Sequence, residues 1–304
     1  MSSDLKMNKP DFVIIGAMKS ATSSLAEQLG KQNGVFMTDP KEPNFFSNDE
    51  IYARGEHWYS SLFDAANVTD IKGEASTHYT KLPKYPETIA RLKRYCPDTK
   101  LIYIMRHPVD RLVSHFTHNW TMAMFQKDMP IETAIKEYAP LIEYGLYKKQ
   151  LDPWLEAFGH ECILPVFFNS LLSEPQQELE RIAKFIGIDG DVVWNQKTGA
   201  NQSVDRYRRI PFQEAIIESK VGTFLRRSLV PKSLRESIRN RRSKGADSNL
   251  SESNIVELES TFNKDLSELG KLFDIELNCK NFKDVTKIPS LEWKIAKNSS
   301  DDSI

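Results

Sequence analysis

The chain lacks the features that would mark a disulfide-bonded scaffold, a membrane protein or a nucleic-acid-binding protein. Its three cysteines, Cys96, Cys162 and Cys279, are widely spaced and odd in number, so no disulfide framework is expected. No run approaches the ~20 consecutive apolar residues of a membrane helix, and the N-terminus has no apolar signal-peptide core. The net charge of −1 gives no electrostatic reason to bind nucleic acid. These absences predict a cytoplasmic protein.

The remaining pattern is typical of one α/β domain. Apolar runs that predict strands alternate with helical patterns. The expected parallel strands are 12–16, 70–74, 101–106 and 163–168. We therefore predict a single domain over residues 10–293, preceded by a flexible N-terminus at 1–9 and followed by a disordered tail at 294–304. Parallel strands place a ligand beyond their carboxyl ends.

The first candidate site follows the strand at 12–16. Gly16 ends this strand, Lys19 and several hydroxyl residues come next, and a helix then begins. The first turn of a helix has unpaired N–H groups and favours negative charge, so this loop predicts a phosphate-like ligand. The Walker A motif requires a second glycine, which is missing here. An ordinary turn with a Ser or Thr cap is the alternative.

A second candidate loop follows the strand at 101–106. Arg106 stands at the end of this strand, and Pro108 suits the first turn of the next helix. Ser114 lies eight residues after Arg106, about two helical turns along. Arg106 and Ser114 could together hold a second phosphate.

Two segments resemble the two cofactor loops of sulfotransferases that use 3′-phosphoadenosine 5′-phosphosulfate (PAPS). These segments are K-S-A-T-S-S-L and R-H-P-V-D-R-L-V-S. The resemblance covers roughly residues 10–200, and it is stronger to the Golgi carbohydrate (heparan sulfate type) enzymes and their bacterial relatives than to the phenol and steroid enzymes. It implies a P-loop-like three-layer fold with a mostly parallel central sheet flanked by helices. It also implies PAPS as donor, 3′-phosphoadenosine 5′-phosphate (PAP) as product, and no metal.

The resemblance also implies roles for individual residues. Lys19 would contact the 5′-phosphosulfate, and Arg106 with Ser114 would hold the 3′-phosphate. The 5′-phosphate would be bound by the loop at Ser20, Ala21, Thr22, Ser23 and Ser24. Relatives often have glycine where this chain has Ala21, and alanine is unfavourable there if the backbone needs a positive φ.

Three residues are candidates for the general base that removes the acceptor's proton. Glu42 is the first choice, because K-E-P-N-F-F resembles the family segment whose glutamate is the base in glycan-modifying members. We expect Phe45 and Phe46 to pack beneath it, an apolar setting that would raise its pKa. Glu74 and His78 are the alternatives. Glycan-modifying relatives often have lysine after the second glutamate; here Ala75 follows, so the chain must do without that cation or substitute another.

The region after residue 200 changes in character. Residues 206–244 contain twelve Lys or Arg and three Glu, a local charge of +9. This segment, in the basic and partly mobile region 200–250, could meet an acidic acceptor, an anionic membrane surface or the 3′-phosphate, or it could be a solvated helix face. Residues 251–272 predict a capped amphipathic helix.

The sequence thus predicts a PAPS-dependent sulfotransferase that acts on a hydroxyl or amine of a glycan or glycoconjugate. The alternatives are a P-loop-type nucleotide or small-molecule kinase, and a non-catalytic nucleotide-binding or membrane-docking module on the same fold. The sequence carries no signal for an oligomeric state.

Overall fold

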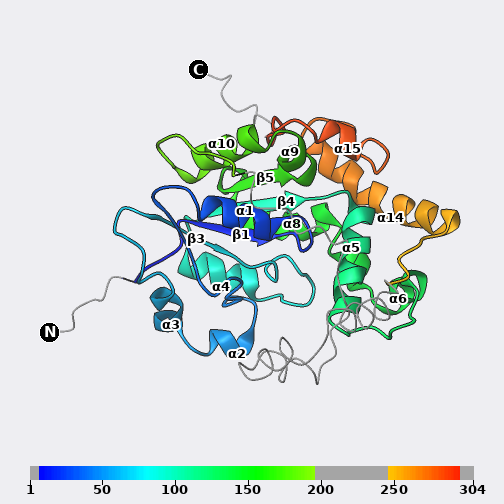
Figure 1. Ribbon diagram of the computed structural model, residues 1–304, viewed down its shortest axis with the longest axis horizontal. Helices are drawn as coiled ribbons and strands as arrows, with labels where there is room; N and C mark the ends of the chain where they lie inside the picture. Colours follow the sequence, from blue (N-terminus) through cyan, green and yellow to red (C-terminus); the bar gives the residue numbers. More distant parts are fainter. Residues whose placement is uncertain (1–6, 196–245, 295–304) are drawn as a thin grey trace, which may run out of the picture.

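The fold is a parallel β-sheet with helices on both faces, as shown by a computed structural model (Figure 1). The structure describes residues 7–195 and 246–294. The predicted basic segment 206–244 lies outside the described residues, as do residues 1–6 and 295–304.

The described sheet has five strands in the order β2-β3-β1-β4-β5, and every neighbouring pair is parallel. The strands are β1 Phe12–Gly16, β2 Val35–Met37, β3 Ile71–Ala75, β4 Lys100–Met105 and β5 Ile163–Phe167. The four predicted strands are confirmed to within a residue or so at each end. Strand β2 was not predicted, because it is three residues long and only half-buried.

Helices cover both faces of the sheet. Up to residue 137 they are α1 Thr22–Leu29, α2 Asp49–Tyr52, α3 Glu56–Ser61, α4 Thr88–Tyr95, α5 Pro108–Thr121 and α6 Ile131–Glu137. Beyond it they are α7 Pro140–Glu143, α8 Tyr147–Phe158, α9 Phe168–Ser173, α10 Pro175–Ile186, α14 Glu252–Lys271 and α15 Phe282–Val285, with a short 3-10 turn at His160–Cys162.

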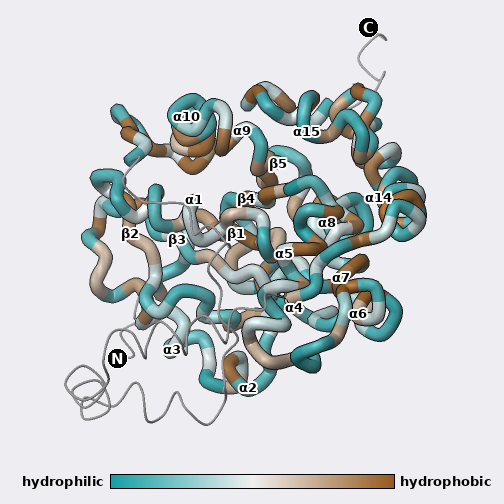
Figure 2. The backbone as a smooth tube through the Cα atoms, turned by 45° about the vertical axis from the view of Figure 1, so that its right-hand side comes forward, coloured by the Kyte–Doolittle hydropathy of each residue, from teal (hydrophilic) through white to brown (hydrophobic). Residues whose placement is uncertain are grey.

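The side-chain alternation of the strands divides the core into two layers. In β1, Phe12 and Ile14 join a cluster with α1 and α10, whereas Val13 and Ile15 join a larger cluster with α4, α5, α8 and α14. Successive side chains of a strand point to opposite faces, so both faces of β1 are buried and its run is apolar throughout. Figure 2 shows hydrophobic stretches along the central strands and hydrophilic ones along much of the outer helices.

Helix α14 confirms the predicted amphipathic helix. Ser251 caps it, since its hydroxyl accepts a hydrogen bond from the Asn254 backbone N–H at 3.4 Å. The buried stripe is Leu258, Phe262, Leu266 and Leu269, and it packs against α8 and α5. Its buried residues belong to the same core cluster as those of α4, α5 and α8.

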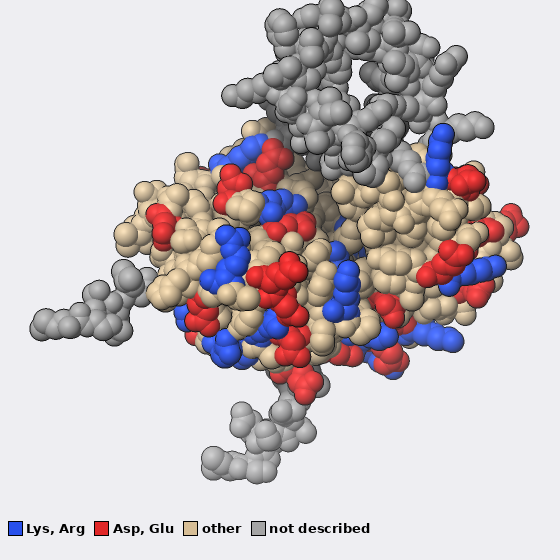
Figure 3. Space-filling view, turned by 90° about the horizontal axis from the view of Figure 1, so that it is seen from below, with Lys and Arg blue, Asp and Glu red and all other residues tan. Residues whose placement is uncertain are grey.

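The surface has no strong field of one sign on the face seen in Figure 3, where acidic and basic side chains alternate. This mixture agrees with the near-zero net charge of the chain. Within residues 7–195 and 246–294, no helix combines the length and the apolar character that crossing a bilayer requires.

Candidate active site

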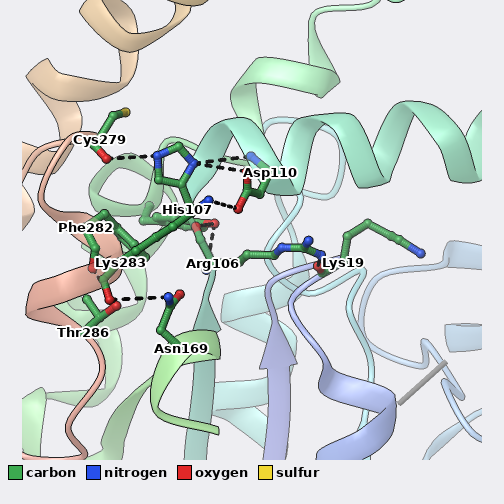
Figure 4. Close-up of polar contacts among 10 residues, drawn as sticks. Lys19, Arg106, His107, Asp110, Asn169, Cys279, Phe282, Lys283 and Thr286 are labelled. Carbon is green, nitrogen blue, oxygen red and sulfur yellow. Dashed lines mark hydrogen bonds and ion pairs between the residues drawn. The ribbon is translucent and has the colours of Figure 1, made fainter. Parts of the chain in front are cut away.

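The two predicted phosphate loops meet at the carboxyl ends of adjacent strands. Strands β1 and β4 are neighbours in the sheet, and Gly16 is paired with Tyr103. The Arg106 Nη1 atom donates a hydrogen bond to the backbone oxygen of Lys19 at 3.3 Å (Figure 4). The topology therefore brings together two cationic residues that are 87 positions apart in the sequence.

Helix α1 begins in this loop with its first-turn amides uncapped by any side chain. Its N-cap residue is Ala21, which makes no side-chain cap, and no acidic residue lies in the first turn. Thr22, Ser23 and Ser24 form that turn. Such amides, with adjacent hydroxyls, suit an anion.

The backbone of this loop is left-handed at two residues that are not glycine. Lys19 has a φ of 72° and Ala21 a φ of 70°. An L-residue pays about 1–2 kcal/mol in this region. Alanine at position 21 was expected to be unfavourable if φ is positive, and the structure has this positive φ.

Tyr147 and Phe168 hold Arg106 in place, in addition to its contact with the Lys19 carbonyl. The Tyr147 hydroxyl accepts a hydrogen bond from the Arg106 N–H at 3.1 Å and donates one to the Arg106 carbonyl at 2.5 Å. The guanidinium lies 4.6 Å from the ring centroid of Phe168, and its buried Nε has no hydrogen-bond partner in the described structure. Ser114 lies farther along α5 and is half-buried.

The C-terminal part of the chain braces the same loop (Figure 4). The Cys279 backbone oxygen lies 3.0 Å from His107 Nε2. The Lys283 ammonium pairs with Asp110 at 2.7 Å. The β4–α5 turn that presents Arg106 is therefore fixed by residues more than 160 positions away.

Glu42 lies among polar partners. Its Oε2 accepts a hydrogen bond from the Thr77 hydroxyl at 3.3 Å, and its Oε1 is 3.5 Å from the Lys41 ammonium. Lys41 also donates a hydrogen bond to the Ser23 hydroxyl. Lys41 thus links Glu42 to the first turn of α1, and the Glu42 side chain remains 32% exposed.

The apolar setting that we predicted for Glu42 belongs instead to Glu74. This carboxyl is fully buried at the end of β3. Burial raises its pKa to about 7, the hydroxyls of Tyr79, Tyr59 and Ser76 oppose the rise, and the charge of Glu42 adds to it. The difference arises because Phe45 stacks on Tyr59, and Phe46 makes edge-to-face contacts with Tyr59 and Tyr79. These two tyrosines lie beside Glu74.

His78 is half-buried and stacks on Tyr85, with ring centroids 5.0 Å apart. Burial, together with the charges of Lys81 and Lys84, lowers the pKa of His78 to about 4. The imidazole is therefore neutral at pH 7, but it is a weak base.

Two buried cations near the two loops, Lys81 and Arg111, were not predicted from the sequence. Lys81 is 8% exposed and Arg111 is fully buried. Arg111 donates a hydrogen bond to the Leu141 carbonyl, and its Nη1 atom lies 3.4 Å from His115 Nδ1. Arg111 also lies within electrostatic range of Lys81 and Arg106, and like charges repel. No local sequence pattern marks these residues, because basic residues in turns and helices are ordinarily exposed.

Comparison with known proteins agrees with this geometry. Residues 9–249 match the family described as "Sulfotransferase domain". Heparan sulfate glucosamine 3-O-sulfotransferase 5 of Mus musculus is 30% identical over 195 residues, 61% of this chain and 55% of that protein. Heparan sulfate glucosamine 3-O-sulfotransferase 3B1 of Mus musculus is 32% identical over 205 residues, 62% of this chain and 50% of that protein. The chain thus spans about half the length of these curated relatives.

A solved structure gives a fuller match. The sulfotransferase from Alicyclobacillus acidocaldarius has 25% sequence identity and a TM-score of 0.57. The match covers 88% of this chain and 97% of that one.

Proposed function

The chain belongs to the sulfotransferase domain family, and from that premise we propose that it transfers the sulfuryl group of PAPS to an acceptor. The acceptor group is a hydroxyl or amine of a glycan or glycoconjugate. PAP is the product.

The observation that carries the proposal is the hydrogen bond between Arg106 and the Lys19 carbonyl. It joins a helix N-terminus with an adjacent lysine to a strand-end arginine, at the edge where parallel sheets bind ligands. An adenosine bisphosphate has two phosphates that need two cationic sites. The buried Arg106 Nε, which has no hydrogen-bond partner in the described residues, fits such an anion.

The residues fit a division of roles along the donor. The amides and hydroxyls of 20–24 would bind the 5′-phosphate, and Lys19 would neutralise the charge that develops on it as the leaving group departs. Arg106 and Ser114 would hold the 3′-phosphate. Positioning and charge stabilisation would then supply most of the rate enhancement, as in phosphoryl transfer.

Glu42 is the base in this proposal. Its carboxylate is partly exposed and is linked through Lys41 to the first turn of α1. It would take the proton of the acceptor hydroxyl while the acceptor oxygen forms its bond to sulfur and the sulfur–oxygen bond to the 5′-phosphate breaks. Glu74 is less suited because it is fully buried, and His78 because its pKa is lowered to about 4.

The glycan acceptor is supported by the relatives, which are named as heparan sulfate glucosamine 3-O-sulfotransferases. Because the chain spans about half their length, acceptor identity is best tested directly. In a screen of glycans with ³⁵S-labelled donor, the protein should transfer the label to a hydroxyl or amine of at least one glycan.

The donor site can be tested without knowing the acceptor. Binding of PAP and of adenosine 5′-phosphate would be measured by calorimetry for the wild type and Arg106→Ala. Because a charged hydrogen-bonding partner is lost, Arg106→Ala should bind PAP roughly 10–100-fold more weakly than the wild type. Its affinity for adenosine 5′-phosphate should fall much less. The exposed Arg54→Ala is the matched control and should change neither.

Lys19→Ala should cut the turnover of labelled donor by about 10²–10³-fold. Failure of the wild type to bind PAP would refute the proposed donor. If Arg106→Ala loses the same factor of affinity for PAP and for adenosine 5′-phosphate, the assignment of Arg106 to the 3′-phosphate is refuted.

A further inference from the structure

Lys81 is a buried cation fixed by its two neighbours in the chain. The Thr80 hydroxyl donates to the Ile15 carbonyl of β1 at 2.9 Å. The Leu82 N–H and carbonyl both bond the buried Gln150 side chain of α8, each at 2.9 Å. Lys81 therefore lies between an anchor on the strand that leads to the Lys19 loop and an anchor on α8.

The contact of Thr80 with β1 is close enough to require glycine. A Cβ placed on Gly16 would come within 1.9 Å of the Thr80 Oγ1 atom. The turn that carries Lys81 is thus packed directly against the start of the phosphate loop. Its ammonium has little freedom to move to solvent, because Lys81 is only 8% exposed.

The surroundings of Lys81 do not neutralise it. Among residues 7–195 and 246–294, no carboxylate oxygen lies within ion-pair distance of its ammonium. Glu42 attracts it from a greater distance, whereas Lys84 and Arg111 repel it. Its Nζ lies 6.0 Å from the ring centroid of Tyr144, the far limit of a cation–π contact.

The charges of Lys81 and Lys19 both lower the pKa of one buried histidine, His115. The charges of Arg111, Lys81, His118 and Lys19, added to burial, lower the pKa of His115 to about 2. The contacts of Thr80 with Ile15 and Gly16 place the turn that carries Lys81 beside the loop that carries Lys19. A buried ammonium with no ion-pair partner is costly unless a ligand supplies the opposite charge.

The end of β3 offers no alternative cation. Ala75, which follows Glu74, is buried and uncharged. Resting on the proposed function, we infer that Lys81 is a second catalytic cation, whose ammonium contacts the sulfuryl oxygens of the donor in addition to Lys19. In the transfer, the acceptor oxygen bonds to sulfur, the bond from sulfur to the 5′-phosphate oxygen breaks, and the acceptor proton goes to Glu42. The Lys81 ammonium keeps its proton throughout.

The inference is tested by comparing two ligands that differ in the sulfuryl group. Calorimetry without acceptor would measure PAPS and PAP binding to the wild type and to Lys81→Met, which keeps the length of the side chain. The preference for PAPS over PAP should fall by roughly tenfold or more, because a charged contact is lost. PAP affinity should change less than about twofold. The exposed Lys84→Met is the matched control and should keep the wild-type ratio.

A pH series gives a second measure. Burial lowers the pKa of Lys81 to about 8; the charge of Glu42 opposes this shift, whereas the charges of Lys84 and Arg111 add to it. The ammonium is present below this pH, so the PAPS preference of the wild type should decline as pH rises through 8. Lys81→Arg, which stays charged, should retain its preference to pH 9.5. The titratable and charged groups that face Lys81 are Glu42, Lys84, Arg111, His78, His115 and Tyr144.

The outcomes separate the two proposals. A wild type that binds neither PAP nor PAPS would overturn the proposed function itself. A wild type that binds both, with Lys81→Met losing affinity for the two equally or for neither, would overturn the inference alone. If Lys81→Met does not fold, Lys81→Arg decides: a pH decline identical to that of the wild type would exclude Lys81 as the titrating contact.

Discussion

Replacing Glu74 by glutamine should make the protein more stable, and more so as the pH rises. The side chain is fully buried among aromatic rings, and burial raises its pKa from the ordinary 4.5 to about 7. The folded state therefore holds a proton that the unfolded state has already released between these two pH values. Stability contributed by the protonated form is present at low pH and is lost as pH rises toward 7. Glutamine keeps the size and removes the titration.

The size of the effect follows from the two pKa values. The difference between 4.5 and about 7 corresponds to about 3 kcal/mol when the group is fully ionised, at 1.36 kcal/mol per tenfold change in proton affinity. Part of the ionisation cost already exists at pH 5, so the gain in unfolding free energy from Glu74→Gln should be about 2–3 kcal/mol larger at pH 8 than at pH 5. Unfolding the wild type at pH 6 should also release about 0.9 of a proton that the variant does not release.

The assay is urea unfolding of both proteins at pH 5 and pH 8, with proton release measured by calorimetry in two buffers. Glu178→Gln is the control, since Glu178 is also fully buried but pairs with Arg181 at 2.6 Å. Glu178→Gln should be less stable than the wild type at both pH values. Its unfolding free energy should still fall between pH 5 and pH 8, because Glu74 still titrates in this variant. If the difference in unfolding free energy between Glu74→Gln and the wild type is the same at pH 5 and pH 8, burial does not raise the pKa of Glu74.

Two further predictions concern the backbone and the base. Ala21→Gly should stabilise the protein by about 0.5–1 kcal/mol, because relief of the left-handed conformation exceeds the entropy that glycine costs. The control Ala90→Gly, at an exposed helical position, should instead destabilise the protein. If both variants are less stable than the wild type in urea unfolding, Ala21 is not strained. Glu42→Gln should keep PAP affinity and lower transfer by about 10²–10⁴-fold in a labelled-donor assay. An unchanged rate would move the base to Glu74 or His78.

Much of the fold is predictable because its signals are local. The runs 12–15 and 101–105 are apolar at every position, which is what a strand buried on both faces requires. The spacing of Leu258, Phe262 and Leu266 likewise marks the buried face of α14. Strand β2 carries no such signal, since its three residues are half-buried.

The meeting of the two loops was predictable for a different reason. Parallel strands end at the same edge, so Lys19 and Arg106 were expected to lie near each other once both strands were recognised. The contact between them was not predictable, because it joins a side chain to a backbone oxygen. Lys81 and Arg111 were missed because their burial depends on α7 and α8, which contribute Leu141 and Gln150.

The two glutamates show why a base is difficult to assign from sequence. Each stands near aromatic residues in the sequence, so an apolar setting is plausible for either. In the structure, the aromatic rings that follow Glu42 pack against the tyrosines beside Glu74. Glu42 is left with Thr77 and Lys41, partly exposed and tied to the phosphate loop. A base must reach its proton before its pKa matters, and on that criterion the exposure of Glu42 outweighs the favourable pKa of Glu74.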